Sequence, residues 1–192
     1  PIETFPGKIV VIDNERDADN AVLQLNNERI IGFDTETRPT FKKGKSNHVA
    51  LIQLSTHDTC YLFRINRIGF TPAIKNLLEN ESLLKVGISL KDDFCMLSRL
   101  NGGQFIPRNF IELQKFVKKY NIEDQSLQKI YGIVIGKKIS KGQRLSNWEA
   151  DHLTENQQLY AATDAWSCIK IYEVLKSGKF KSPIYKIQPS SL

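Results

Sequence analysis

The pattern of hydrophobic and polar positions in this 192-residue chain begins with short apolar runs. Lys8–Ile12 and Ile30–Asp34 are predicted strands, and the polar stretch between them carries apolar residues at helical spacing. The β-branched run His48–Thr56 and the following Cys60–Ile65 predict two more strands, joined by a hairpin turn. The N-terminal part of the chain therefore indicates a sheet with an antiparallel pair.

Strands and helices alternate in the rest of the chain. Thr154 and Gln157 form a capping box, which predicts the start of a helix that continues to Lys176. The other predicted elements are helices over Pro72–Asn80, Asp92–Leu100, Lys115–Tyr120 and Ser126–Ile135, strands over Leu83–Ile88 and Phe105–Leu113, and a basic loop over Lys137–Trp148. This order predicts an α/β fold with one domain over residues 1–180, a mixed β-sheet flanked by α-helices, and a peripheral C-terminal tail over residues 181–192.

Composition excludes several classes of protein. Hydrophobic residues make up 41% of the chain and charged residues 25%, a balance typical of a folded domain. No apolar run reaches the ~18 residues of a membrane span, and no secretory signal is visible. Three cysteines and three histidines, without zinc-ligand spacing, predict neither a disulfide scaffold nor a zinc site. We expect a soluble, cytoplasmic (intracellular) domain with no membrane partner and no small-molecule cofactor.

The net charge of +6 is unevenly distributed. Residues 101–144 contain nine basic and three acidic side chains, and Lys42, Lys43 and Lys45 form a second basic group in a predicted loop. Clustered lysines suit phosphate backbones, because each neutralised phosphate releases counterions. The alternative is an ordinary solvated surface, so charge alone is weak evidence for nucleic acid.

Carboxylates stand where predicted strands end and predicted helices begin. Asp34 and Glu36 share one face of their strand, about 7 Å apart, although a strand that simply ends at water would look the same. Asp92 and its neighbour Asp93 open a helix, where acidic residues also serve as ordinary caps. Tyr160 and Asp164 lie one turn apart on the last helix, as an ordinary surface pair could.

Together these segments resemble the DEDDy 3′–5′ exonucleases, of the ribonuclease D and Werner exonuclease group. The resemblance covers roughly residues 5–176 and implies a ribonuclease H-like fold. Its ordered motifs are Phe33-Asp34-Thr35-Glu36-Thr37 followed by Val49-Ala50-Leu51-Ile52-Gln53-Leu54-Ser55, then Val86-Gly87-Ile88-Ser89-Leu90-Lys91-Asp92-Asp93, and finally Ser146-Asn147-Trp148 before Leu159-Tyr160-Ala161-Ala162-Thr163-Asp164-Ala165.

The resemblance implies a set of catalytic residues. Asp34, Glu36, Asp93 and Asp164 match the family's metal ligands, with Asp93 preferred to Asp92 because it falls on the ligand position counted from Val86. Tyr160 matches the tyrosine that gives the subclass its final letter. One departure is Glu112, where relatives more often show aspartate, and we expect it to support the site from outside the ligand set.

The implied chemistry is phosphodiester hydrolysis with two Mg²⁺ or Mn²⁺ ions, for which oxygen ligands are suited. The expected activity shortens DNA or RNA from the 3′ end and releases nucleoside 5′-monophosphates, with Tyr160 orienting the attacking water. The resemblance also implies apolar contacts to the substrate strand and lysine contacts to its backbone. We expect these contacts to come from Phe33, Leu90 and Phe94, and from Lys42, Lys43, Lys45, Lys137, Lys138, Lys141 and Arg144.

Two other interpretations stay open. The chain could be a non-catalytic nucleic-acid-binding or scaffolding relative, although a candidate residue fills every catalytic position. It could also be a nuclease module of a larger polymerase or helicase. The sequence does not distinguish DNA from RNA, because 2′-hydroxyl contacts come from a few groups that it does not place.

Overall fold

The computed structural model describes residues 1–181. Its centre is a six-stranded mixed β-sheet. The strand order is β1-β4-β3-β2-β5-β6. Strand β3 is antiparallel to both of its neighbours, and the other pairs are parallel. The strands are β1 (Lys8–Ile12), β2 (Ile30–Thr37), β3 (Val49–Ser55), β4 (Thr59–Phe63), β5 (Leu84–Gly87) and β6 (Phe110–Glu112). The predicted α/β fold with a mixed sheet is confirmed.

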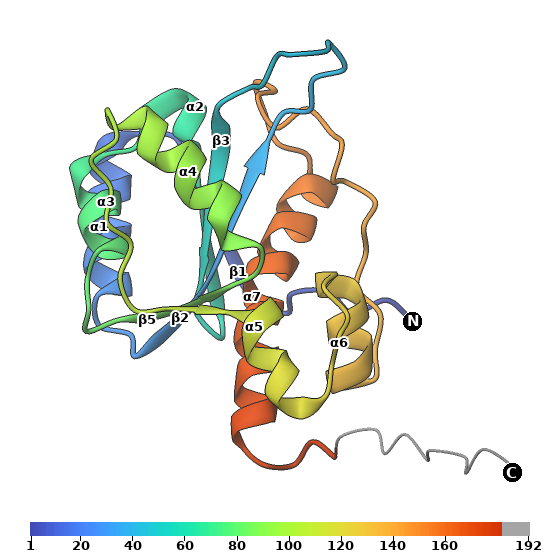
Figure 1. The fold of residues 1–192 in the computed structure, drawn as a ribbon. Helices are drawn as coiled ribbons and strands as arrows, with labels where there is room; N and C mark the ends of the chain where they lie inside the picture. The colour runs from blue at the N-terminus through green and yellow to red at the C-terminus, as the bar shows by residue number, and fades with distance from the viewer. Residues whose placement is uncertain (182–192) are drawn as a thin grey trace, which may run out of the picture.

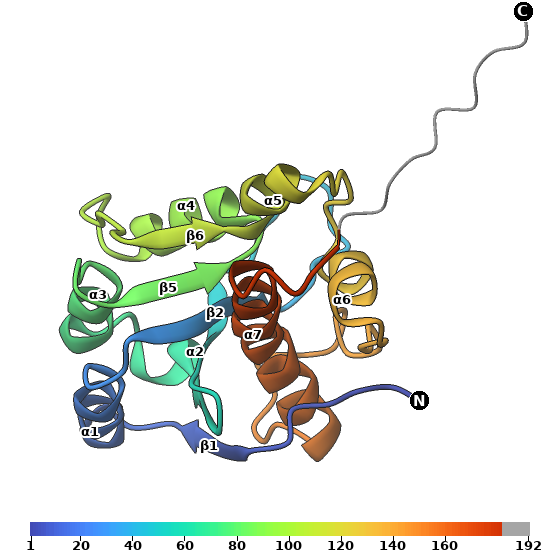
Figure 2. The same cartoon turned by 90° about the horizontal axis from the view of Figure 1, so that it is seen from below.

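Helices cover both faces of the sheet (Figures 1 and 2). One apolar core lies between the sheet and α1, α3 and α4, and the other lies between the sheet and α5, α6 and α7. The helices are α1 (Glu15–Leu25), α2 (Ile65–Ile68), α3 (Pro72–Leu78), α4 (Leu90–Leu100), α5 (Leu113–Phe116), the 3₁₀ turn η1 (Val117–Tyr120), α6 (Leu127–Ile135) and α7 (Glu155–Lys176). The predicted capping box of α7 is present, with Thr154 Oγ1 accepting from the Gln157 backbone N–H.

Helix α7 approaches β2 closely because a glycine stands at the crossing. A Cβ atom placed on Gly32 would lie only 1.9 Å from the carbonyl oxygen of Ala165. The crossing is lined by small residues on the helix side as well, since Ala161, Ala162 and Ala165 are fully buried. This approach sets how near the side chains of α7 come to those of β2.

Some predicted boundaries were wrong. The strand predicted over Phe105–Leu113 begins only at Phe110, because Pro107 has no backbone N–H and Asn109 has a positive φ of 55°. The helix predicted over Lys115–Tyr120 is 3₁₀ from Val117 onward. Strand β2 extends three residues beyond its predicted end at Asp34, to Thr37.

The predicted C-terminal tail and the predicted absence of a membrane span concern the chain outside the sheet. Of the predicted peripheral tail over residues 181–192, positions 182–192 lie outside the described residues. In the part of the chain that the structure describes, no helix is long and apolar enough to cross a membrane.

Candidate active site

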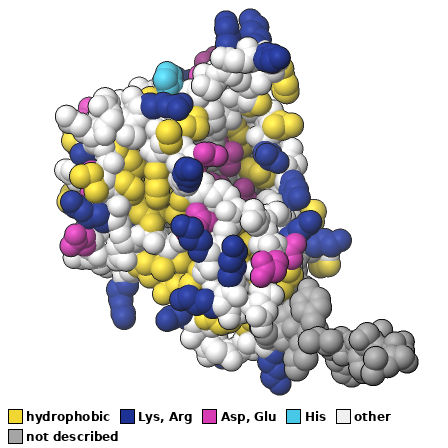
Figure 3. Space-filling view, in the orientation of Figure 1, with side chains coloured by type: hydrophobic (Ala, Val, Ile, Leu, Met, Phe, Trp, Pro, Cys, Tyr) yellow, Lys and Arg dark blue, Asp and Glu magenta, His cyan; other side chains and the backbone are white. Residues whose placement is uncertain are grey.

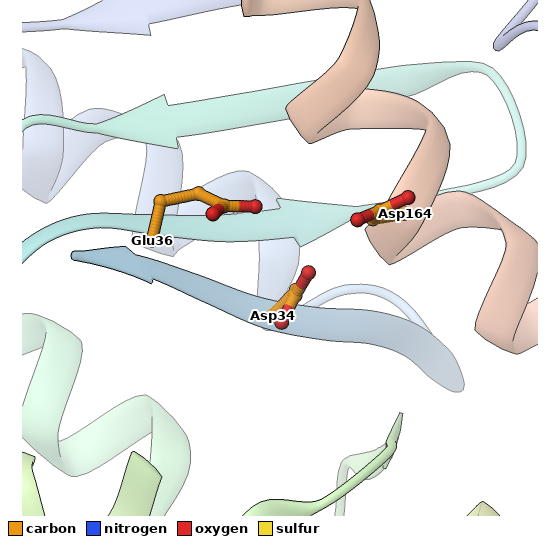
Figure 4. A group of neighbouring side chains, drawn as sticks. All are labelled: Asp34, Glu36 and Asp164. Carbon is orange, nitrogen blue, oxygen red and sulfur yellow. The ribbon is translucent and has the colours of Figure 1, made fainter. Parts of the chain in front are cut away.

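Strand β2 and helix α7 bring three carboxylates together. Asp34 and Glu36 alternate along β2 and so share its α7-facing side, while Asp164 projects from the buried face of α7. One oxygen from each of the three carboxylates lies within 4.8 Å of the others. Figure 4 shows the three side chains converging on the space between the strand and the helix.

Helix α4 adds a fourth carboxylate beside this group. The Asp93 carboxylate accepts a hydrogen bond from the Thr35 hydroxyl of β2, and its charge raises the pKa of both Asp34 and Glu36. The adjacent Asp92 is exposed and lines a separate hollow. The structure therefore turns Asp93, rather than Asp92, toward the other carboxylates.

Burial raises the pKa of every carboxyl group in the cluster, and repulsion by the neighbouring carboxylates adds to the shift for Asp34 and Glu36. Burial is the largest cause for each, and it raises the pKa of Asp93 and of Asp164 to about 7. The pKa of Asp34 is raised further by the charges of Glu36, Asp164 and Asp93. Burial also raises the pKa of Tyr160, with the charges of Asp164, Glu36 and Asp34 adding to the shift. Negative charge here is costly unless a cation neutralises it.

The residues fit a divalent cation. Asp164 Oδ1 is buried and has no hydrogen-bond partner among the described residues, so it remains available as a ligand. The convergent donors are all carboxylate oxygens, which Mg²⁺ and Mn²⁺ prefer over the nitrogen and sulfur ligands of zinc sites. A divalent cation bound here would relieve the repulsion that the geometry builds up.

Tyr160 borders the same pocket one helical turn before Asp164. Its side chain is largely buried, and its ring packs against that of Trp148 at a centroid distance of 6.0 Å. Trp148 is fully buried, which makes it a packing residue that supports the tyrosine and leaves no ring surface for a base.

Gln53 on β3 was not predicted as a site residue. It stands opposite Asp34 in the antiparallel register, and its Nε2 donates to Glu36 Oε1 at 3.2 Å and to Asp34 Oδ2 at 3.5 Å. The same nitrogen lies 3.3 Å from the carbonyl oxygen of Ala161 in α7. A signal for it existed: a fully buried amide in an otherwise apolar strand needs polar partners.

Glu112 stabilises the helix that carries Asp93. Its carboxylate accepts from the backbone N–H groups of Ser89 and Leu90 at 3.0 and 2.7 Å, at the start of α4. Ser89 has a positive φ of 54°, a conformation that non-glycine residues adopt only where neighbours hold it. Glu112 thus lies outside the carboxylate cluster and anchors α4.

The basic residues that were predicted to contact the substrate lie in three separate regions of the structure. Lys141 and Arg144 line the pocket of about 330 Å³ that contains the carboxylates, and Arg144 lowers the pKa of Glu36. Lys137 forms an ion pair with Glu3 at 3.2 Å, and the neighbouring Lys138 accepts a backbone hydrogen bond from that same N-terminal segment. Lys42, Lys43 and Lys45 lie in the loop between β2 and β3. On the face in Figure 3, acidic side chains lie near the centre and basic ones around them.

The apolar residues that were predicted to contact the substrate lie in different surroundings. The ring of Phe33 is 1% exposed and packs among Phe94 and Phe110 in the core, so we withdraw it from the predicted substrate contacts. Leu90 and Phe94 line a hollow of about 690 Å³ beside the start of α4. Phe94 is partly exposed there, whereas Leu90 is almost buried.

Comparison with known proteins decides the family. The 3′–5′ exonuclease domain family matches residues 9–178. The chain belongs to this 3′–5′ exonuclease family. Its members are hydrolases that act on nucleic acids, and the resemblance to the DEDDy exonucleases is confirmed by this match and by a Werner-type relative.

Curated relatives include much longer proteins. The chain is 34% identical to the mouse bifunctional 3′–5′ exonuclease/ATP-dependent helicase WRN, over 91% of the chain and 13% of the mouse protein. It is 28% identical to an Arabidopsis thaliana 3′–5′ exonuclease, over 92% of the chain and 66% of that protein. The chain thus spans a small part of the mouse helicase and about two thirds of the plant enzyme.

Solved structures of 3′–5′ exonucleases share the fold. The EXO domain of Aedes aegypti Nibbler superposes with a TM-score of 0.81 at 23% identity, covering 91% of each chain. Escherichia coli RNase D superposes with a TM-score of 0.78 at 20% identity, over 90% of this chain and 45% of that one. The expected ribonuclease H-like fold is confirmed.

Proposed function

We propose that this exonuclease domain hydrolyses the terminal phosphodiester bond at the 3′ end of DNA or RNA and releases nucleoside 5′-monophosphates. The observation that carries the proposal is the convergence of Asp34, Glu36 and Asp164, with Tyr160 lining the same pocket and Asp93 hydrogen-bonded to Thr35, which also lines it. Membership of the family supports the reaction class, and a carboxylate or the tyrosine stands at each position that the proposal requires.

The four carboxylates are proposed to hold two Mg²⁺ or Mn²⁺ ions. Bound divalent ions supply an activated water and neutralise the charge that develops on the phosphate and the leaving oxygen. Asp34, Glu36 and Asp164, whose carboxylate oxygens converge, would hold the ions together with Asp93. The basic side chains of Lys141 and Arg144 balance the substrate phosphate from the other wall of the pocket.

Tyr160 is proposed to orient the attacking water. Its raised pKa keeps the phenol protonated at neutral pH, so the hydroxyl is a hydrogen-bond donor and acceptor rather than a base. The water oxygen loses a proton and bonds to phosphorus, the bond from phosphorus to the 3′ oxygen breaks, and that oxygen takes up a proton to become the new 3′ hydroxyl. Packing against Trp148 fixes the ring during this step.

The substrate and its outer contacts complete the proposal. The substrate is DNA or RNA, and one structural relative was solved with RNA U12 bound. Leu90 and Phe94 contact the substrate strand, and Lys42, Lys43, Lys45, Lys137 and Lys138 extend the basic surface around the pocket. One domain over residues 1–180 is proposed to perform the reaction, and the location is proposed to be intracellular, as expected from the sequence.

Product analysis tests the proposal. The purified protein is incubated with single-stranded DNA, a duplex with a recessed 3′ end, or RNA, in Mg²⁺ or Mn²⁺, and the products are separated by chromatography. We expect nucleoside 5′-monophosphates from at least one substrate. Salt-sensitive binding without any mononucleotide would instead favour a non-catalytic binding module.

A further inference from the structure

The loop between β2 and β3 has a defined shape. Its base is closed by Asn47, whose side-chain nitrogen donates to the Arg38 carbonyl oxygen at 2.7 Å. Its tip turns at Gly44, which has a φ of 77°, and the Lys45 backbone N–H donates to the Lys42 carbonyl oxygen at 3.2 Å. Arg38 also forms an ion pair with Glu149, which ties the loop to the segment before α7. Figure 1 shows the loop projecting beyond the end of the sheet.

The tip presents an aromatic ring beside three positive charges. Phe41 is 88% exposed, more than any other large hydrophobic residue described. Lys42, Lys43 and Lys45 are exposed, and none of them forms an ion pair with a carboxylate in the described part of the chain. An exposed ring costs free energy in water, and unpaired lysines attract phosphate. This combination is typical of surfaces that stack bases and follow a nucleic-acid backbone.

The loop lies near the carboxylates but outside their pocket. Strand β2 carries Glu36 and leads directly into the loop, and Phe41 follows five residues later. An extended chain rises about 3.4 Å per residue, so the two residues are separated by at most ~17 Å. The hollow beside the loop and the pocket of the carboxylates share no lining residue. A strand whose 3′ end occupies the pocket would reach the loop several nucleotides upstream.

We propose that the tip of this loop, Phe41 with Lys42, Lys43 and Lys45, is a second binding site for a single strand of the nucleic-acid substrate. Phe41 stacks on a base, and the lysines neutralise the adjoining phosphates. The site rests on the proposed function and deepens it, because it makes substrate affinity depend on strand length. At ~3.4 Å per stacked nucleotide, the loop reaches bases up to about five nucleotides from the 3′ end.

Steady-state kinetics on two strand lengths test the site. A DNA trinucleotide fills only the pocket, whereas a 12-mer also reaches the loop. We expect Phe41→Ala and the triple variant Lys42→Ala/Lys43→Ala/Lys45→Ala to raise KM for the 12-mer at least about fivefold. Phe41→Ala should leave kcat on either substrate, and KM for the trinucleotide, within about twofold of the parent. Phe41→Trp, which keeps a stacking ring, should restore the affinity.

Two control variants test whether the loss of any exposed apolar side chain, or of any three exposed lysines, has the same effect. Leu23→Ala removes an exposed apolar side chain from α1, and Lys8→Ala/Lys118→Ala/Lys176→Ala removes three exposed lysines elsewhere. Neither should change the ratio of the two KM values. The proposal would be overturned if the loop variants raised KM equally for the trinucleotide and the 12-mer, or changed neither KM. It would also be overturned if the control variants raised KM for the 12-mer as much as the loop variants do.

A binding measurement separates this site from the proposed function. Fluorescence anisotropy with a labelled 12-mer in EDTA needs no catalysis. If the parent protein cleaves neither substrate, the proposed function fails, but the binding assay still tests the loop site. Weaker binding of the 12-mer by Phe41→Ala, with unchanged binding by Leu23→Ala, supports the site. Unchanged binding by Phe41→Ala overturns it. The salt slope of binding should also fall by about 0.7 for each substituted lysine that neutralises a phosphate in the parent protein.

Discussion

The side-chain nitrogen of Gln53 lies 3.2 Å from Glu36 Oε1, which joins β3 to the carboxylates of β2 across the antiparallel pair. The same nitrogen contacts Asp34 and the Ala161 carbonyl oxygen of α7. One buried amide therefore connects β2, which carries Asp34 and Glu36, to α7, which carries Asp164. Because an amide donates to carboxylates without adding charge, Gln53 orients Asp34 and Glu36 while leaving their negative charge available for a cation.

Replacing Gln53 by methionine should weaken metal binding. The substitution keeps a flexible side chain of similar volume and removes the donor, so Asp34 and Glu36 lose their fixed orientation. We expect the affinity for Mn²⁺, measured by calorimetry, to fall about 10-fold or more, with the free energy of unfolding changed by less than ~1.5 kcal/mol. Ser55→Ala removes a buried hydroxyl from the same strand without touching a carboxylate and should leave Mn²⁺ affinity unchanged. Equal affinities for the parent and Gln53→Met would contradict the positioning role.

The carboxylate cluster should make the metal-free protein less stable as the pH rises. Asp93 and Asp164 have pKa values raised from 3.8 to about 7, so the folded state binds more protons than the unfolded state in that range. The free energy of unfolding should therefore fall between about pH 4 and pH 7 in EDTA. Urea denaturation across this range measures it.

Neutralising the central carboxylate should reduce that dependence. Asp34→Asn removes a charge that faces Glu36 and Asp164, so the variant in EDTA should be more stable than the parent above pH 7. Mn²⁺ should raise the melting temperature of the parent and have a much smaller effect on the variant. A parent whose stability rises steadily through this pH range in EDTA would refute strong repulsion in the cluster.

Gly32 should be intolerant of any side chain. A Cβ at this position would meet the Ala165 carbonyl oxygen at 1.9 Å and its carbon at 2.7 Å, and these are backbone atoms that no side-chain rotation can move away. Gly32→Ala should push α7 away from β2, lower the free energy of unfolding by at least ~2 kcal/mol, and separate Asp164 from Asp34. Gly132→Ala in α6 is the control, because its nearest contact would be an ordinary 3.8 Å, and it should be neutral or slightly stabilising. Equal melting temperatures of Gly32→Ala and Gly132→Ala in thermal unfolding would contradict the close crossing.

Tyr160→Phe should separate catalysis from metal binding. The variant keeps the ring that packs on Trp148 and loses the hydroxyl that borders the carboxylates. We expect kcat to fall at least about tenfold, with Mn²⁺ affinity within twofold of the parent. An unchanged kcat would make the tyrosine a packing residue, and a loss of Mn²⁺ binding would make its hydroxyl part of the metal site.

Much of the fold was accessible from sequence because each element carries its own periodicity. The capping box at Thr154 and the apolar run of β3 are local signals, and the structure places both as predicted. The alternation along β2 likewise put Asp34 and Glu36 on one face. What failed was also local: Pro107 and Asn109 interrupt a run whose apolar residues favoured a longer strand.

Tertiary contacts account for the rest. The role of Gln53 depends on β3 pairing with β2 in one register, which no periodicity encodes. The packing of Phe33 is likewise a tertiary contact, because its place within an apolar strand gave no sign that Phe94 and Phe110 would enclose it. The choice of Asp93 over its neighbour came from a resemblance, and the hydrogen bond with Thr35 now gives it a physical reason.

The most direct test of the central claim is a single gel assay. A 5′-labelled oligonucleotide is incubated with the parent protein in Mn²⁺, with the parent in EDTA, and with Asp34→Asn in Mn²⁺. We predict a ladder that shortens from the 3′ end in the first reaction and intact substrate in the other two. Metal-dependent shortening by Asp34→Asn at the parental rate would show that the carboxylate cluster is not the catalytic centre.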